Sequence, residues 1–390
     1  MTPAARVAAA IEILDMIGDG LPAEQVLTRW GRANRFAGSK DRAAIRDYVF
    51  DVLRVQRSAA WHGCASTGRG LMIGLLRLQG VDLETMFTGE GHAPAPLMDY
   101  EQGLAEGDMP VADAWNLPDW LAALFSDGLE DSEQGEATAM MLQSRAPVTL
   151  RVNTSKSSVP EAIQMLENAG VTVTANPLSP TALTVTEGSR KIRNSPAYQD
   201  GHVELQDASS QAVVDALPEA KRVLDYCAGG GGKSLALAAR SKARLFAHDI
   251  DPARMRDLPL REARAGAEIT QLGTGDLSQN GPYDLVLVDA PCSGSGSWRR
   301  APEAKWRLTA EELEKTTKLQ DDILDDAAAL VAEEGVLAYA TCSILQVENR
   351  ARVEAFLDRN SGWECTWQKT FDVCADGDGF FTAHLTKAKE

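Results

Sequence analysis

The sequence predicts an α/β protein in three parts: an all-α N-terminal domain, a small α+β unit, and a doubly wound, mostly parallel sheet. Three observations carry this prediction. Apolar residues recur at helical spacing near the N-terminus. A strand–helix–strand–strand pattern begins at Pro147. Strands then alternate with helices through the rest of the chain, which at 390 residues has room for two or three domains.

Residues 1–140 are predicted to form the all-α domain. The first helix covers residues 4–17, where alanine, valine, leucine and isoleucine recur every three or four positions. A second helix begins at Ser39, a candidate N-cap, and continues to Arg54. Prolines and glycines after residue 78 indicate loops and short helices in an acidic linker.

Basic residues gather around the second helix. Between Arg29 and Arg57 there are eight basic residues and three acidic ones. Such a cluster forms either a solvated helix face or a contact with RNA phosphates. Under the second interpretation, Arg42 and Arg46 are RNA-binding residues.

The net charge of −17 argues at first sight against a nucleic-acid partner. The acidic residues, however, are concentrated in one stretch of the chain. Residues 78–144 contain 14 Asp and Glu and no Lys or Arg, so this stretch carries −14 of the −17 and leaves −3 for the rest of the chain. The acidic stretch is typical of a solvated face and does not exclude a basic groove elsewhere.

Residues 141–200 are predicted to form the small α+β unit, which is RRM-like. Three segments are strand-like: 148–153, 171–174 and 182–185. Ser158 can cap a helix between the first two strands, and Pro160 suits its first turn. Gly170 suits the position just after the end of that helix.

Residues 201–390 are predicted to form the catalytic domain with the doubly wound sheet. Six strands are expected, at residues 222–225, 243–248, 268–271, 285–288, 335–339 and 379–385. A long helix is expected at residues 309–332. The carboxyl ends of the strands should form the ligand crevice of such a sheet.

Two cysteines lie at the ends of buried strands in this domain. Cys292 follows the apolar run Leu285–Val288, and Cys342 follows Val336–Tyr339. A single cysteine at such a position is more often an inert core residue. Two thiols at one crevice, downstream of a glycine-rich loop, favour thiol chemistry instead.

The remaining cysteines show no paired metal-ligand spacing, and no metal site is expected. The N-terminal residues are typical of an amphipathic helix and not of a signal peptide. No run of 18 apolar residues predicts a membrane span. We therefore expect a cytoplasmic protein with reduced thiols, no membrane association and no obligate protein partner.

A glycine-rich loop follows the strand at residues 222–225. It consists of Cys227, Ala228, Gly229, Gly230, Gly231, Gly232 and Lys233. Glycines at a strand–helix turn let a ligand approach the backbone and the free N–H groups of the helix N-terminus. The loop lacks the clean G-x-G-x-x-G spacing of dinucleotide sites and is not a phosphate loop.

Acidic residues end three of these strands. Asp249 is placed to bind two ribose hydroxyls, Asp276 to meet an adenine edge, and Asp289 completes the set. Each acid alone is more often a helix cap or turn residue. Together with the glycine loop, they favour S-adenosylmethionine, a ligand without phosphate that carries a cationic sulfonium and an amino group.

The ordered motifs resemble the bacterial RsmB/Sun (Nop/Sun) family of RNA cytosine-5 methyltransferases. The resemblance is strong over residues 145–390 and rests on the loop 225–233, Asp249, Asp276, Asp289-Ala-Pro-Cys292-Ser-Gly, Thr341-Cys342-Ser343 with Glu348-Asn349, and Asp378-Gly-Phe-Phe381. Gln206–Gln211 is similar to the segment that leads into the family's catalytic domain. Residues 38–42 are similar to the NusB-like helical domain of the same proteins. One departure is the loop Cys-Ala-Gly-Gly-Gly-Gly-Lys, where the family usually has Cys-Ala-Ala-Pro-Gly-Gly-Lys.

The resemblance implies a Rossmann-like S-adenosylmethionine-dependent methyltransferase that forms 5-methylcytosine, most naturally in small-subunit ribosomal RNA. It implies that Cys342 adds to C6 of the base, which makes C5 nucleophilic. It also implies that Cys292 assists release of the product. Asp289 is placed to hydrogen-bond the N3 edge of cytosine or to contact the cofactor, and Lys233 could favour a thiolate.

A base can be attacked at C6 only after it has been unstacked, which is least costly in single-stranded RNA. The segment after Cys292 offers basic and aromatic residues for such a strand: Trp298, Arg299, Arg300, Lys305, Trp306 and Arg307. The alternative is a surface loop in which Trp306 anchors the chain to the core.

Two further functions remain open. A DNA cytosine-5 methyltransferase would use Cys292 as the nucleophile, although the second thiol and the helical N-terminus argue against it. A non-catalytic RNA-binding or ribosome-assembly factor would need none of these groups, yet all of them are present.

Overall fold

The computed structural model describes residues 1–103, 105, 107–128 and 132–388. The chain forms two compact units. One unit contains residues 1–144 together with 298–307, and the other contains residues 145–297 together with 308–390. Among the described residues, no helix is long and apolar enough to cross a membrane.

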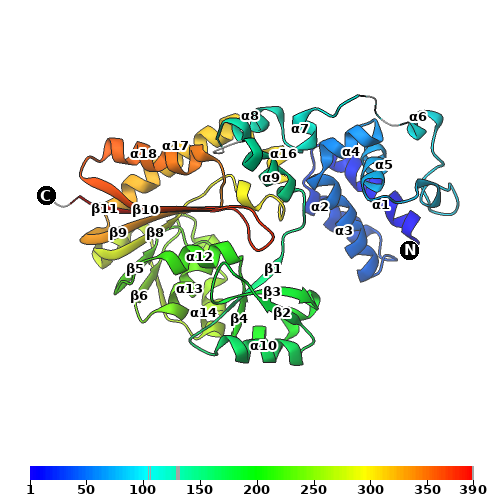
Figure 1. Cartoon of the computed structure of the whole chain (residues 1–390). Helices are drawn as coiled ribbons and strands as arrows, with labels where there is room; N and C mark the ends of the chain where they lie inside the picture. The colour runs from blue at the N-terminus through cyan, green and yellow to red at the C-terminus, as the bar shows by residue number, and fades with distance from the viewer. Residues whose placement is uncertain (104, 106, 129–131, 389–390) are drawn as a thin grey trace. The chain divides into compact units, whose positions relative to one another are not determined.

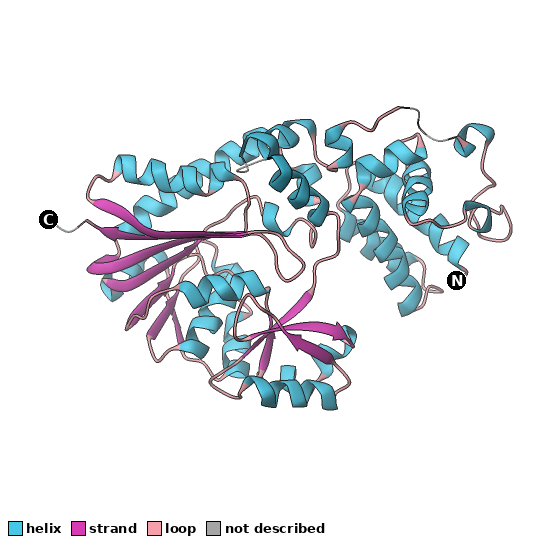
Figure 2. Ribbon diagram, viewed as in Figure 1, coloured by secondary structure: helices cyan, strands magenta, loops and turns pink. Residues whose placement is uncertain are grey.

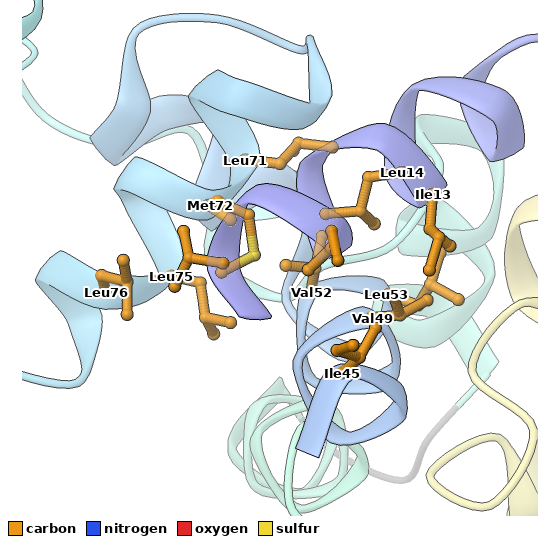
Figure 3. Packing of buried hydrophobic residues seen from close by; sticks show 14 of the residues in the cluster. Ile13, Leu14, Ile45, Val49, Val52, Leu53, Leu71, Met72, Leu75 and Leu76 are labelled. Atoms are coloured by element: carbon orange, nitrogen blue, oxygen red, sulfur yellow. The ribbon is translucent and has the colours of Figure 1, made fainter. Parts of the chain in front are cut away.

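The first unit is all-α, as the sequence predicts. Its helices are α1 (Pro3–Gly18), α2 (Ala23–Ala33), α3 (Ser39–Arg54), α4 (Gln56–Gly63), α5 (Gly68–Leu78), α6 (Asp99–Gln102), α7 (Val111–Ala114), α8 (Asp119–Gly128), α9 (Ser132–Leu142) and α16 (Ala304–Arg307). The apolar faces of α1, α3 and α5 meet in the core shown in Figure 3, where Ile13 and Leu14 lie near Val52, Leu53 and Met72. Helical spacing gives α1 and α3 one buried stripe each, whereas α5 is buried continuously from Gly70 to Leu76.

The predicted start of α3 is one residue late. The N-cap is Gly38, whose N–H donates to the carboxylate of Asp41 at 3.3 Å, and Ser39 is the first helical residue. A glycine at this position is favoured almost as well as a serine.

The segment 298–307 belongs to the helical unit, whereas the sequence assigned it to the catalytic domain. The ring of Trp298 stacks on Phe125 with centroids 6.4 Å apart. The indole N–H of Trp306 donates to the carbonyl of Leu53 at 2.7 Å, and the ammonium of Lys305 donates to the carbonyl of Arg54 at 2.9 Å. These contacts join residues between 173 and 253 positions apart in sequence, so local patterns could not reveal them.

Replacing Trp298 with alanine is expected to destabilise the helical unit by about 3–5 kcal/mol, the usual cost of truncating a buried aromatic side chain. Trp298 is 1% exposed. Urea unfolding followed by far-UV circular dichroism measures the loss. Phe36→Ala is the control, because Phe36 is an exposed aromatic of the same unit. A loss no larger than that of the control would contradict the anchoring of this segment.

The second unit begins with a small antiparallel sheet of order β2-β3-β1-β4. Its elements are β1 (Val148–Val152), α10 (Val159–Asn168), β2 (Thr172–Ala175), β3 (Ala182–Glu187), α11 (Pro196–Gln199) and β4 (Val203–Leu205). Ser158 caps α10 as predicted, and Gly170 adopts φ +72° after its end. Helix α10 packs against this sheet (Figure 2). Strand β4 was not predicted, because three residues carry too little alternation to identify a strand.

The main sheet has seven strands in the order β10-β11-β9-β8-β5-β6-β7. The strands are β5 (Arg222–Asp225), β6 (Arg244–Ala247), β7 (Ile269–Gln271), β8 (Tyr283–Asp289), β9 (Val331–Thr341), β10 (Trp363–Phe371) and β11 (Phe380–Lys387). The pairs β7–β6–β5–β8–β9 are parallel, and β11 and β10 add antiparallel strands beside β9. The predicted doubly wound, mostly parallel sheet is confirmed.

Helices cover both faces of this sheet (Figure 1). On one face lie α12 (Ala208–Ala216), α13 (Gly232–Arg240) and α14 (Leu258–Ala265), and on the other lie α17 (Ala310–Ala328) and α18 (Arg350–Arg359). The strand residues Leu285–Val288 are fully buried between them. Burial on both faces explains the continuous apolar runs that the sequence shows.

Candidate active site

The two strand-end thiols meet. Strands β8 and β9 are parallel neighbours, with Asp289 opposite Ala340, so the loops that follow them leave the same edge of the sheet. The sulfur atoms of Cys292 and Cys342 lie 3.4 Å apart. The predicted convergence of the two thiols is confirmed.

The two thiols are electrostatically unequal. The hydrogen bond with Cys292 lowers the pKa of Cys342, and the positive charge of Lys233 acts in the same direction against burial and nearby acids. The pKa of Cys292 is raised, first by that same hydrogen bond and then by burial. This asymmetry makes Cys342 the better thiolate, because a thiolate is stabilised by donors and cations.

Lys233 forms an ion pair with Asp289 beside the thiols. The ammonium and the carboxylate lie 2.7 Å apart, and Lys233 is buried whereas Asp289 is partly exposed. Burial opposes the charge on Lys233, but the attraction of Asp289 outweighs it and raises the pKa of the lysine. The ion pair thus favours the charged form of Lys233, which lines the same cavity as Cys342.

The glycine loop is held in a shape that requires glycine at two positions. Gly229 and Gly231 adopt φ of +52° and +78°, a left-handed region that other residues rarely enter. A Cβ at Gly231 would also lie 2.3 Å from the side chain of Leu258. The N–H of Gly229 donates to the carboxylate of Asp249 at 2.9 Å, which fixes the loop to the end of β6.

A cavity of about 550 Å³ lies between this loop and the thiols. It is lined by Gln206, Ser210, Cys227, Ala228, Gly229, Gly230, Gly232, Lys233, Arg254, Arg261, Asp289, Ala290, Pro291, Cys292 and Cys342. Six predicted cofactor residues of the loop and Asp289 are in this lining. Burial raises the pKa of Cys227, so its thiol stays protonated. A volume of this size suits a small organic ligand.

The other predicted cofactor residues lie outside the lining. Gly231 faces Leu258. Asp249 is buried behind the loop, where it also accepts a hydrogen bond from Arg254 at 3.1 Å. Asp276 is exposed and accepts from the N–H of Gly273 at 3.3 Å, which is the turn-capping role that we considered as its alternative.

Six cavity residues were not predicted as site residues: Gln206, Ser210, Arg254, Arg261, Ala290 and Pro291. Gln206 accepts a hydrogen bond at 2.6 Å from Arg151, a buried arginine of the small sheet. Its only signal was its place in the segment that leads into the catalytic domain. Nothing in the sequence marked Arg254 and Arg261 as cavity residues, because arginines in polar helical segments are usually solvated.

Comparisons with known proteins identify the family of this chain. A family described as 16S rRNA methyltransferase RsmB/F matches residues 212–386, and a ferredoxin-like domain of RsmF/B-like methyltransferases matches residues 117–190. Probable ribosomal RNA small subunit methyltransferase B of Synechocystis sp. is 31% identical over 319 residues, which cover 74% of this chain and 71% of that protein. The chain belongs to the RsmB/F methyltransferase family.

Ribosomal RNA small subunit methyltransferase B of Photorhabdus laumondii is 32% identical to this RsmB/F member, over 69% of this chain and 66% of that protein. The chain thus matches about two thirds of the length of these curated relatives. The crystal structure of PH0851 covers 99% of both chains at 23% identity with a TM-score of 0.74, which shows a shared fold. The NusB-like character of the helical domain stays a prediction.

Three of the predicted RNA contacts in this RsmB/F member are corrected by their burial. Trp298, Arg299 and Lys305 are each 1% exposed. The side chains of Trp298 and Lys305 anchor the segment 298–307 in the helical unit, and none of the three buried side chains presents a surface to RNA. Burial, together with the nearby Arg54, lowers the pKa of Lys305 to about 7.

The other predicted RNA contacts are exposed: Arg42, Arg46, Arg300 and Arg307. Arg46 pairs with Glu24, and Arg307 pairs with Glu303 at 2.6 Å. Ion pairs of exposed side chains are weak and can exchange for phosphate contacts. These four arginines therefore remain candidates.

Asp225, at the end of β5, is a buried acid beneath the site. Burial raises its pKa to about 7 against a hydrogen bond from Ser234 at 2.6 Å, and Asp289 adds to the rise. Its other carboxylate oxygen has no hydrogen-bond partner among the described residues. The folded state therefore holds a proton that the unfolded chain releases near pH 4.

Because the pKa of Asp225 is higher in the folded protein than in the unfolded chain, the free energy of unfolding should depend on pH. The stability due to protonated Asp225 is complete below pH 4 and is lost as the pH rises through 7. Asp225→Asn should remove this loss, which can amount to about 4 kcal/mol for a pKa difference of 3.2. Urea unfolding at pH 5 and pH 8 measures it, with the exposed Asp322→Asn as control. An equal pH dependence in the Asp225→Asn variant and the wild type would contradict the prediction.

Proposed function

We propose that this protein is an S-adenosylmethionine-dependent RNA methyltransferase that forms 5-methylcytosine, with small-subunit ribosomal RNA as its substrate. The observation that carries the proposal is the pair of thiols 3.4 Å apart beside a cavity lined by the glycine loop. The names of the curated relatives support the choice of ribosomal RNA.

The cavity residues fit S-adenosylmethionine. The ligand is a zwitterion with an additional sulfonium charge, and the lining supplies both signs through Asp289, Arg254 and Arg261. The glycine loop leaves room for a ligand against the backbone at the start of α13. Binding of a ribose by Asp249 would require Arg254, which is half-exposed, to release that carboxylate. When bound, the cofactor supplies an electrophilic methyl group to the base.

Cys342 is proposed to act as the nucleophile. Its thiolate adds to C6 of cytosine, and the electron pair of the C5–C6 bond moves so that C5 becomes able to take the methyl group. Lys233 keeps the thiolate available, as the pKa of Cys342 is lowered partly by that cation. The ion pair of Lys233 with Asp289 keeps this cation beside the sulfur atoms.

Cys292 is proposed to assist release. After methyl transfer, C5 carries both a methyl group and a proton, and the proton must leave before the bond between Cys342 and C6 can break. Cys292 is the thiol nearest to that bond, at 3.4 Å from the other sulfur. Once Cys292 has released its own proton to water, its thiolate would take the C5 proton; the electron pair of the broken C5–H bond would reform the C5–C6 double bond and expel Cys342 as a thiolate.

Asp289 is proposed to orient the base. Its carboxylate is partly exposed in the lining, between Lys233 and the thiols. A hydrogen bond between Asp289 and the N3 edge of the bound cytosine would withdraw electron density from C6. The exposed arginines, Arg42, Arg46, Arg300 and Arg307, are proposed to bind RNA phosphates.

Methyl-labelled S-adenosylmethionine tests the function directly. We expect label in small-subunit ribosomal RNA and none in duplex DNA of matched sequence, with 5-methylcytidine as the labelled nucleoside after digestion. Label in DNA would favour the alternative cytosine methyltransferase that uses Cys292. No transfer to any RNA, by protein that binds the cofactor, would overturn the proposal.

A further inference from the structure

A buried carboxylate links the two cysteine loops. Glu348 lies in the short helix Gln346–Glu348 after β9, and its side chain is 0% exposed. One oxygen accepts from the N–H of Ser293 at 2.8 Å and from the amide of Gln320 at 3.2 Å. The other accepts from the hydroxyls of Ser293 and of Ser343, the latter at 2.5 Å. Among the described residues, no cation forms an ion pair with Glu348.

The donors come from the residues next to the two thiols. Ser293 follows Cys292, and Ser343 follows Cys342. Gln320 of α17 also donates at 2.9 Å to the carbonyl of Pro291, the residue before Cys292. One carboxylate thus holds both loops from one side.

Further hydrogen bonds join the same two loops behind this carboxylate. Ser295 and Ser343 share a hydrogen bond of 2.8 Å, and the N–H of Ile344 donates to Ser295 at 2.9 Å. The N–H of Gly296 donates to the carbonyl of Cys342 at 3.0 Å. Ser343 and Ser295 are fully buried, so this network is shielded from water.

A buried carboxylate without a cation is costly unless its donors satisfy it. Four donors do so here, and all of them belong to the cysteine loops or to the helix that supports one of them. We propose that Glu348 is a positioning residue that fixes the spacing and the unequal reactivity of Cys292 and Cys342. This inference rests on the proposed function for its catalytic consequence, but the thiol geometry can be tested without RNA.

The charge of Glu348 has a second effect on the thiols. It adds to the rise in the pKa of Cys292 and opposes the fall in the pKa of Cys342. Lys233 acts on Cys342 from the cofactor side with the opposite sign. The charge of Glu348 thus disfavours a thiolate at both sulfurs, whereas the charge of Lys233 stabilises a thiolate at Cys342.

Glu348→Gln is the sharpest variant, because it keeps the size of the side chain and removes half of its acceptors. An amide NH₂ would face either the two serine hydroxyls or the two N–H donors. Glu333→Gln is the matched control, since Glu333 is an exposed glutamate of the same unit that pairs only with Lys387 among the described residues. Glu348→Asp keeps the charge but shortens the side chain.

The readout is alkylation of each cysteine by iodoacetamide between pH 6 and 9 in the full-length protein, measured by peptide mass spectrometry. We expect wild type and Glu333→Gln to alkylate first at Cys342. In Glu348→Gln the ratio of Cys342 to Cys292 alkylation should fall at least tenfold, and the pH profiles of the two thiols should converge. A preserved ratio and profile in a folded Glu348→Gln protein would overturn the proposal.

Ser293→Ala and Ser343→Ala keep the test decisive if Glu348→Gln does not fold. Each removes one hydroxyl donor from the carboxylate and leaves its charge and the cysteines in place. We expect each to reduce the alkylation ratio by a smaller factor than Glu348→Gln, and no change in either would also overturn the proposal.

Methyl transfer adds a catalytic readout. Glu348 does not line the cavity, so Glu348→Gln should leave the Kd for S-adenosylmethionine within about twofold while kcat falls about 100-fold from misplaced reacting groups. Wild-type protein that transfers no methyl group would refute the proposed function and would leave the alkylation test of Glu348 intact.

Discussion

Replacing Cys342 with alanine is expected to abolish both methyl transfer and covalent capture of RNA. The nucleophile that activates C5 would be absent, and losing a covalent nucleophile lowers kcat by roughly 10⁴-fold or more. Transfer of labelled methyl groups and denaturing gel electrophoresis of the protein–RNA mixture measure the two losses. Cys365→Ala is the control, because Cys365 is a free thiol on β10, away from the cavity.

Residual methylation above about one per cent in Cys342→Ala would show that another group activates the base. Loss of methylation in Cys365→Ala would indicate that the substitution of any cysteine harms the fold. In that case the Cys342 result alone would carry no mechanistic meaning.

Replacing Cys292 with alanine is expected to produce the opposite covalent phenotype. Cys342 can still add to C6 and the base can still be methylated, but the C5 proton has no thiolate to receive it. A protein–RNA complex that survives denaturation should accumulate to near one equivalent, while turnover falls at least 100-fold. The complex is measured as a slow band on a denaturing gel and as methyl label that remains with the protein.

Exchanged phenotypes would reverse the two roles. If Cys292→Ala abolished capture and Cys342→Ala accumulated the adduct, Cys292 would be the nucleophile, as in the DNA methyltransferase alternative. The lowered pKa of Cys342 argues against that outcome.

Much of the catalytic sheet could be predicted from the sequence, because its central strands are buried on both faces. Leu285–Val288 of β8 and Val336–Tyr339 of β9 are entirely apolar, and the neighbouring positions of these two strands bring Cys292 and Cys342 together. Strand β10 was missed because most of Trp363–Phe371 is exposed at the edge of the sheet and polar in sequence. An edge strand of this kind is defined by its pairing with β11 rather than by its own pattern.

The RNA interpretation of residues 298–307 failed in part because composition does not distinguish a buried cation from an exposed one. Lys305 is held by the carbonyl of Arg54, a partner 251 positions away in sequence. The sequence also allowed an alternative in which Trp306 anchors the chain to the core. The hydrogen bond from its indole N–H to the carbonyl of Leu53 agrees with that alternative. Tertiary contacts decided between the two interpretations.

The cofactor site also depends on tertiary contacts that the local sequence does not reveal. The glycine loop was identified from its residues, since only glycine tolerates the φ values of Gly229 and Gly231. The position of Asp249 behind the loop depends on how β6 and the loop meet, which one sequence does not encode locally. Glu348 was noted only as part of a family-like motif, and its contacts with both cysteine loops became visible in the fold.

The most direct test of the central claim is to identify which sulfur bonds to the base. RNA that carries 5-fluorocytidine at the target position should trap the adduct, because fluorine at C5 cannot leave as a proton. After digestion of protein and RNA, we expect mass spectrometry to locate the modified nucleotide on the peptide that contains Cys342. A nucleotide attached to the peptide that contains Cys292, or no covalent nucleotide at all, would contradict it.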